Sequence, residues 1–173
     1  RARELLELAE RLADRQADRR ELQEVLRAGE QALDALREVL DALSSAKGWG
    51  TWDMLGGGTL ATAVKHDRIN TARNAAHRAQ QRLSRFSREL ADVRLEVAGM
   101  TVKLTGFESF ADYFFDGLLA DWSVQNKIGD ALRSAEATER RVRELLHRLE
   151  RRLQQTRQEL AQIQQARRQI LEP

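Results

Sequence analysis

The chain has 173 residues with a formal net charge of +2, and 32% of its residues are charged whereas only 5% are aromatic. This composition is typical of long helices and coiled coils. The sequence has no cysteine, which excludes disulfide bonds, thiolate metal sites and cysteine nucleophiles. Its only proline is the last residue, so no proline interrupts a helix. The longest weakly charged stretch, 48–64, is too short and too polar to span a bilayer.

The first predicted helix covers residues 1–46. Its apolar side chains fit a heptad repeat without a slip, and nine of the twelve core positions are leucine, which indicates a coiled-coil helix. Arg15 and Arg19 occupy two of the other core positions, and we expect a polar break there because charged groups in a core need partners or water. From Val25 onward a third row of the helix is also apolar, so this half should face more than one partner helix.

Residues 48–58 form a predicted loop that is rich in glycine and tryptophan. The glycine triplet before Thr59 could offer backbone amides to an anion at the start of a helix. No strand precedes the triplet and no phosphate-binding motif surrounds it, so we favour a hinge whose Trp49, Trp52 and Met54 cover the end of the helices. The alternative is a recognition tip with exposed indoles.

The second predicted helix covers residues 59–98, and its apolar residues follow the same heptad spacing. If the chain turns back between residues 46 and 59, the residue numbers of any two residues that face each other across the two helices add to about 105. This register places Gly29 opposite Ala76, two small residues that let the backbones approach. It also places Arg19 near Phe86, which favours a cation–π contact.

Six arginines lie between residues 68 and 88 of the second helix, with no acidic residue among them. Three of them, Arg78, Arg85 and Arg88, form a candidate basic face that could follow phosphates in a nucleic acid. The other three flank the core seam, where they should meet the first helix, which carries 11 acidic and 8 basic residues over 1–46. Because aromatic residues do not alternate with the arginines as base stacking requires, nucleic-acid binding is not favoured.

The connector 99–117 contains a short predicted helix at 107–115. Its aromatic residues, together with Trp49, Trp52 and Met54, form a candidate interaction surface. These residues are Phe107, Phe110, Phe114 and Phe115. Such a surface could enter a membrane interface, but three nearby aspartates oppose binding to anionic lipids. We therefore favour a protein partner over a membrane.

The third predicted helix covers residues 118–171, again with heptad spacing. A connector over 99–117 reaches about 40 Å, less than the length of the first helix. We therefore expect an all-α, up-down-up three-helix bundle forming a single elongated domain over 1–173, with the first and third helices parallel. The alternative is an antiparallel stalk of these two helices with 49–117 folded as a helical head.

No grouping of side chains in the sequence has the spacing of a catalytic, cofactor or metal site. Long apolar seams with charged flanks are typical of proteins that bind other helices. We therefore predict a non-enzymatic, cytoplasmic coiled-coil scaffold or protein-interaction module that needs no cofactor and self-associates as a homo-oligomer. Nucleic-acid association through the second helix, or contact with a membrane interface, is the alternative.

Overall fold

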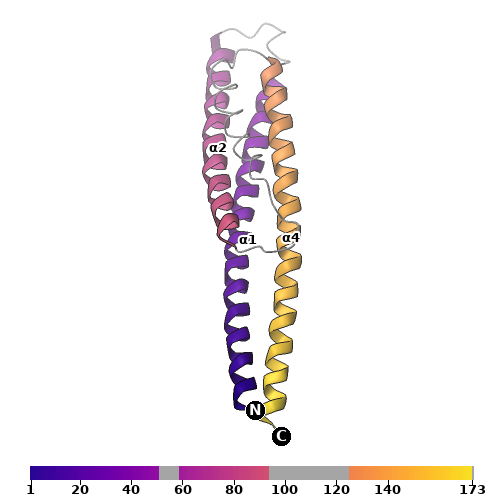
Figure 1. Cartoon of the computed structure of the whole chain (residues 1–173). Helices are drawn as coiled ribbons and strands as arrows, with labels where there is room; N and C mark the ends of the chain where they lie inside the picture. Colours follow the sequence, from indigo (N-terminus) through magenta and orange to yellow (C-terminus); the bar gives the residue numbers. More distant parts are fainter. Residues whose placement is uncertain (51–58, 94–124, 173) are drawn as a thin grey trace.

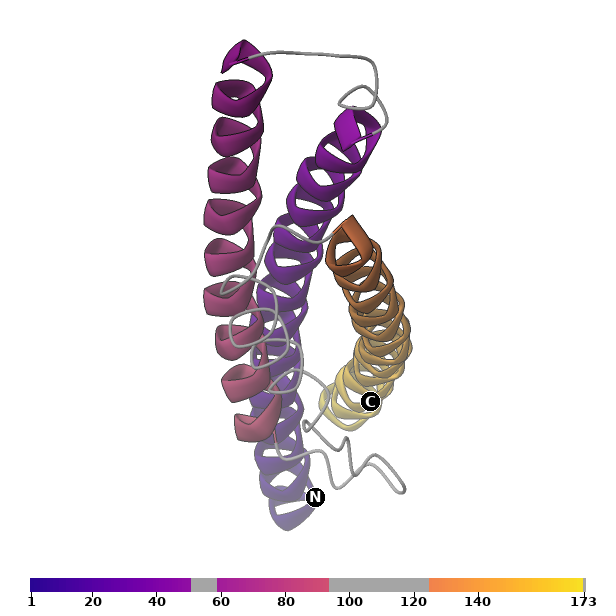
Figure 2. The same cartoon turned by 90° about the horizontal axis from the view of Figure 1, so that it is seen from above.

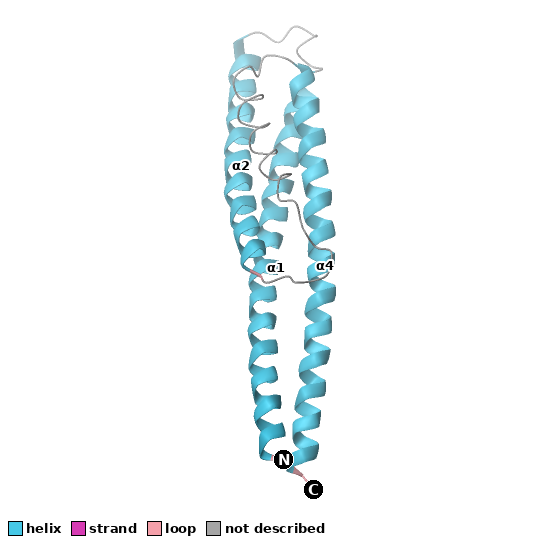
Figure 3. Cartoon of the chain, viewed as in Figure 1, coloured by secondary structure: helices cyan, strands magenta, loops and turns pink. Residues whose placement is uncertain are grey.

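The computed structural model describes residues 1–50, 59–93 and 125–172. These residues form three long helices, α1 (Ala2–Gly50), α2 (Thr59–Asp92) and α4 (Gln125–Leu171) (Figure 1). Within the described residues the structure is almost entirely helical, as Figure 3 shows. The predicted all-α three-helix bundle is therefore confirmed.

The helix boundaries differ from the predicted ones where glycine or a connector was expected to end a helix. α1 continues to Gly50, through residues predicted to belong to the loop 48–58. A glycine costs a helix only about 1 kcal/mol relative to alanine, so it does not by itself end one. α2 ends at Asp92 instead of 98. The predicted short helix 107–115 lies outside the described residues.

α2 runs antiparallel to α1, as predicted, but in a different register. Arg78 donates to Glu38 at 2.9 Å, and Arg82 donates to Gln31 at 2.9 Å. Facing residue numbers therefore add to about 115, whereas the hairpin register predicted about 105. Gly29 accordingly lies against Phe86, and the predicted contact between Gly29 and Ala76 is wrong. The prediction failed because it assumed that the two helices start and stop at one level, whereas α2 begins beyond the end of α1.

α4 also runs antiparallel to α1, so the predicted up-down-up order with parallel first and third helices is wrong. The Arg1 side chain donates to the Ile170 carbonyl at 3.0 Å, and Arg15 lies 3.4 Å from Glu159. Facing residue numbers add to about 175, and both termini lie at one end of the molecule (Figure 1). The antiparallel pair of the alternative layout is correct, but α2 packs along α1 and does not belong to a separate head.

The length of the second connector explains this correction. α2 ends beside the middle of α1, near residue 23, and α4 begins beside the end of α1, near residue 50. The chain must therefore travel back about 40 Å along the bundle. The 31 residues of 94–124 could span about 100 Å if extended, so the connector covers this distance easily. The distance is also shorter than the one expected from the sequence, because α2 ends beside the middle of α1 and not near its start.

α1 is the central helix, and α2 and α4 pack on two different sides of it (Figure 2). α2 and α4 hardly approach each other. α1 carries the extra apolar row predicted from Val25 onward, and a second one beside it. Both rows are buried in the C-terminal half of α1. The first row consists of Val25, Ala32 and Val39, and the second of Ala28 and Ala35. The prediction that this half faces more than one helix is confirmed.

The same two rows are charged in the N-terminal part of α1, where α2 no longer packs. Going toward the N-terminus at seven-residue steps, they become Asp18, Arg11 and Glu4 in one row and Glu21, Asp14 and Glu7 in the other. The change from charged to apolar occurs between residues 21 and 25, at the level where α2 ends. The sequence of α1 thus marks where the bundle changes from two helices to three.

Side chains of both α2 and α4 pack on α1 at Gly29. A Cβ atom at this position would lie 2.6 Å from Leu146 Cδ2 and 2.8 Å from Phe86 Cε2. Phe86 is fully buried, and Leu146 is 6% exposed. The absence of a side chain at Gly29 therefore lets one residue from each neighbouring helix pack directly on the α1 backbone.

Candidate interaction surfaces

Beyond the C-terminal end of α2, the molecule consists of an antiparallel pair of helices. We call this pair, residues 1–21 of α1 and 153–171 of α4, the stalk. Its seam is less well covered than the three-helix part. Leu22, Leu36 and Leu43 are almost completely buried in the three-helix part, whereas Leu5 and Leu12 are only half-buried in the stalk. Leu8, Leu160 and Ile163 of the stalk seam are buried as well. The seam is therefore closed along its centre, and a groove lies on each side of it.

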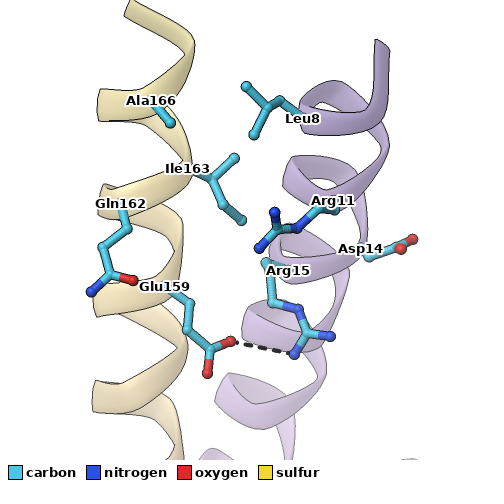
Figure 4. A pocket seen from close by; sticks show the side chains of 8 residues that line it. All are labelled: Leu8, Arg11, Asp14, Arg15, Glu159, Gln162, Ile163 and Ala166. Carbon is cyan, nitrogen blue, oxygen red and sulfur yellow. Dashed lines mark hydrogen bonds and ion pairs between the residues drawn. The ribbon is translucent and has the colours of Figure 1, made fainter. Parts of the chain in front are cut away.

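The first groove lies on the side of the stalk that α2 occupies higher up, and Figure 4 shows it. Its cavity measures about 450 Å³. Apolar side chains from both helices meet there beside a set of opposite charges. The lining residues are Leu8, Arg11, Asp14, Arg15, Glu159, Gln162, Ile163 and Ala166.

Arg15 forms the polar break predicted for the seam, and it has acidic partners on both helices. Its guanidinium lies 2.9 Å from Asp18 and 3.4 Å from Glu159. Glu159 is also 3.6 Å from Arg152. The charges of the first groove are thus balanced by nearby groups of opposite sign, and this part of the prediction is confirmed.

The second groove lies on the opposite side of the seam, and its cavity measures about 250 Å³. Arg19 from α1 and Arg157 from α4 line it together, with no acidic residue in the lining. The other lining residues are Gln16, Leu160, Ala161 and Gln164. The predicted contact of Arg19 with Phe86 is wrong, because Phe86 packs at the level of Gly29, about 15 Å further along α1.

Sequence reasoning did not predict that Arg157 would lie beside Arg19 in this groove. Arg157 flanks the heptad seam, and none of the residues three or four positions away from it is acidic. This lack of a local partner is visible in the sequence. The missing acidic neighbour indicates a shared site only when the antiparallel pairing of α1 with α4 is known, because that pairing brings the two arginines to one groove.

The candidate basic face on α2 is largely occupied by local ion pairs. Arg78 binds Glu38 of α1, and Arg85 lies 3.6 Å from Glu89 on its own helix. Arg88 is exposed and forms no ion pair with any described residue. Of the arginines expected to meet α1, Arg82 does so through Gln31, whereas the acidic residue Glu38 of α1 pairs with Arg78 instead. Two of the three arginines of this face are thus paired with carboxylates.

Most of the predicted aromatic surface lies outside the described residues. Trp49 belongs to α1, but its side chain is not described. The other members lie in 51–58 and 94–124, and they stay a prediction. They are Trp52, Met54, Phe107, Phe110, Phe114 and Phe115.

No family model, curated protein or solved structure matches the chain. Among the described helices, none is long and apolar enough to cross a membrane.

Proposed function

We propose that the chain is a non-enzymatic helical scaffold that acts through protein–protein interaction and self-associates through its stalk. The observation that carries this proposal is a pair of exposed leucines beside the seam of the stalk. Leu6 and Leu171 are the large apolar side chains that stay exposed in the described residues, at 62% and 52%. Both lie near the open end of the stalk, where exposed apolar side chains offer a contact for another chain.

The interior of the bundle supports a structural role as well. The described core is built of hydrocarbon side chains together with two buried threonines. Both hydroxyls donate to a carbonyl in the preceding turn of their own helix, Thr138 to Ser134 and Thr156 to Arg152. Because both hydroxyls are satisfied within their own helix, they leave no polar group free in the described core to bind a ligand. A partner would therefore bind to the outer surface of the bundle.

Self-association is tested by the mass of the protein in solution. Sedimentation equilibrium of the full chain over a hundredfold range of concentration should give a mass of two chains or more at the upper end. A Leu6→Glu, Leu171→Glu double variant should move the protein toward one chain, because it places charges in the apolar contact. A single-chain mass at every concentration for the unmodified protein would refute self-association.

A matched control separates the stalk from a general effect of added charge. Ala137 is an exposed residue on the outer face of α4 in the three-helix part. Ala137→Glu adds a negative charge to the same helix as Leu171→Glu, and it should leave the mass unchanged. If this variant dissociates the assembly as well, the contact does not lie in the stalk.

A further inference from the structure

The second groove of the stalk brings two arginines together without an acidic partner. Arg19 and Arg157 come from antiparallel helices and face each other across the seam, as their positions in the α1–α4 register require. Neither forms an ion pair or a hydrogen bond with any described residue, and both are exposed. The surrounding polar side chains are the amides of Gln16 and Gln164.

The absence of acidic partners is a local feature and not a general property of the stalk. Arg15, one turn before Arg19, is held by Asp18 and Glu159. Residues three or four positions away from Arg19 are Arg15, Gln16, Leu22 and Gln23, so none of them is acidic. The usual neutralisation within a helix is therefore missing on both sides of the second groove.

Two like charges in one groove repel each other, and an anion between them removes this repulsion. A guanidinium presents a planar fork of donors that matches the two oxygens of a carboxylate or phosphate. A glutamine amide nitrogen adds two further donors. We propose that the second groove is a binding site for an oxyanion, a carboxylate or phosphate, held between Arg19 and Arg157.

Such an oxyanion could be free in solution or belong to a second copy of the chain. α1 carries Glu7, Asp14 and Glu21 at heptad spacing on the exposed face of the stalk. None of the three forms an ion pair with a described residue, so each could supply a carboxylate to a neighbouring stalk. Both sources use the same chemistry in the groove, and the proposal holds whether or not the chain self-associates.

Inorganic phosphate is the probe for the site. Binding is measured by titration calorimetry and by thermal melting, with chloride adjusted to keep the ionic strength constant. Phosphate affinity should fall at least tenfold in Arg19→Gln and in Arg157→Gln. It should change less than twofold in Arg11→Gln, which removes the same charge from the first groove, where Asp14 and Glu159 lie nearby.

The melting temperature in chloride alone provides a second readout. Arg157→Gln should melt at the same or a higher temperature than the unmodified chain, because the repulsion is removed, yet phosphate should raise its melting temperature less. Arg157→Lys keeps the charge and loses the fork, so it should retain part of the phosphate effect. Equal phosphate effects in the unmodified chain, Arg157→Gln and Arg11→Gln would overturn the proposal.

Sedimentation in the presence of phosphate distinguishes the two sources. If a carboxylate of a second copy occupies the groove, phosphate and Arg157→Gln should each lower the average mass. If the oxyanion is free, phosphate should bind while the mass stays constant. Either result supports the site, whereas absence of a difference in phosphate affinity together with an unchanged mass refutes it. Self-association itself is judged by the Leu6→Glu, Leu171→Glu variant, so the two proposals can fail separately.

Discussion

Gly29 lies at the point where side chains of α2 and α4 both touch the α1 backbone. Gly29→Leu should destabilise the protein by about 1–3 kcal/mol or more, because the new side chain would overlap Leu146 and the buried Phe86 ring. Urea denaturation followed by circular dichroism measures the change. An unchanged or higher midpoint would show that the three helices do not meet at this residue.

Gly129 provides the matched control at the same scale. The nearest side-chain atom to a Cβ at this position is the end of Arg133, 3.8 Å away. Gly129→Ala should therefore stabilise α4 by about 0.5–1 kcal/mol, because alanine favours the helix and nothing obstructs its methyl group. The two glycines should thus respond with opposite signs in the same denaturation experiment.

Thr156 is a buried polar residue whose hydroxyl should contribute little to stability. It is fully buried, and its hydroxyl donates to the Arg152 carbonyl at 3.0 Å. Thr156→Val keeps the branched shape and leaves that carbonyl its helical partner, so the free energy of unfolding should stay within about 1 kcal/mol of the original. A loss larger than this, measured in urea, would indicate that the hydroxyl also stabilises the core in another way.

At the scale of an element, α1 is one helix with two different surfaces. Ala32 is fully buried in a row that is charged further down the helix. Ala32→Glu should cost about 3 kcal/mol or more, because an unpaired carboxylate would be buried among α1's neighbours. The free energy of unfolding measures this cost.

Arg11 is the control for this prediction, because it occupies the same heptad row in the stalk. Arg11→Ala should change the free energy of unfolding by no more than about 0.5 kcal/mol, since the position is exposed and has no third helix beside it. Equal effects of the two substitutions would contradict the placement of the boundary between the stalk and the three-helix part.

At the scale of the whole molecule, the antiparallel pairing of α1 and α4 makes a rod of about 75 Å. The chain has no cysteine, so pairs of spin labels can be placed without interference. Arg3→Cys with Arg168→Cys should give a short distance, because both lie at the open end of the stalk. Arg3→Cys with Arg133→Cys should give about 60 Å, because Arg133 faces α1 near residue 42. Parallel helices would reverse the two results.

Several features of this molecule follow from the sequence alone, because helices form through bonds between residues four positions apart. The heptad leucines of α1 predict a long helix with an apolar seam, and the apolar row that begins at Val25 predicts a second neighbouring helix for residues 25–50. Both features are local patterns that need no knowledge of the partner. The polar break at Arg15 follows in the same way from one charged residue in the seam.

The direction and the register of the helices were decided only by the tertiary structure. An apolar stripe fits a parallel or an antiparallel neighbour equally well, so the heptads could not set the direction of α4. That direction depends on where α2 stops and on the long connection that follows it. The register depends on how Phe86 and Leu146 fit against Gly29, a match of shapes from three distant parts of the chain. The groove shared by Arg19 and Arg157 depends on that direction, because only antiparallel pairing of α1 with α4 brings these two residues to the same level of the bundle.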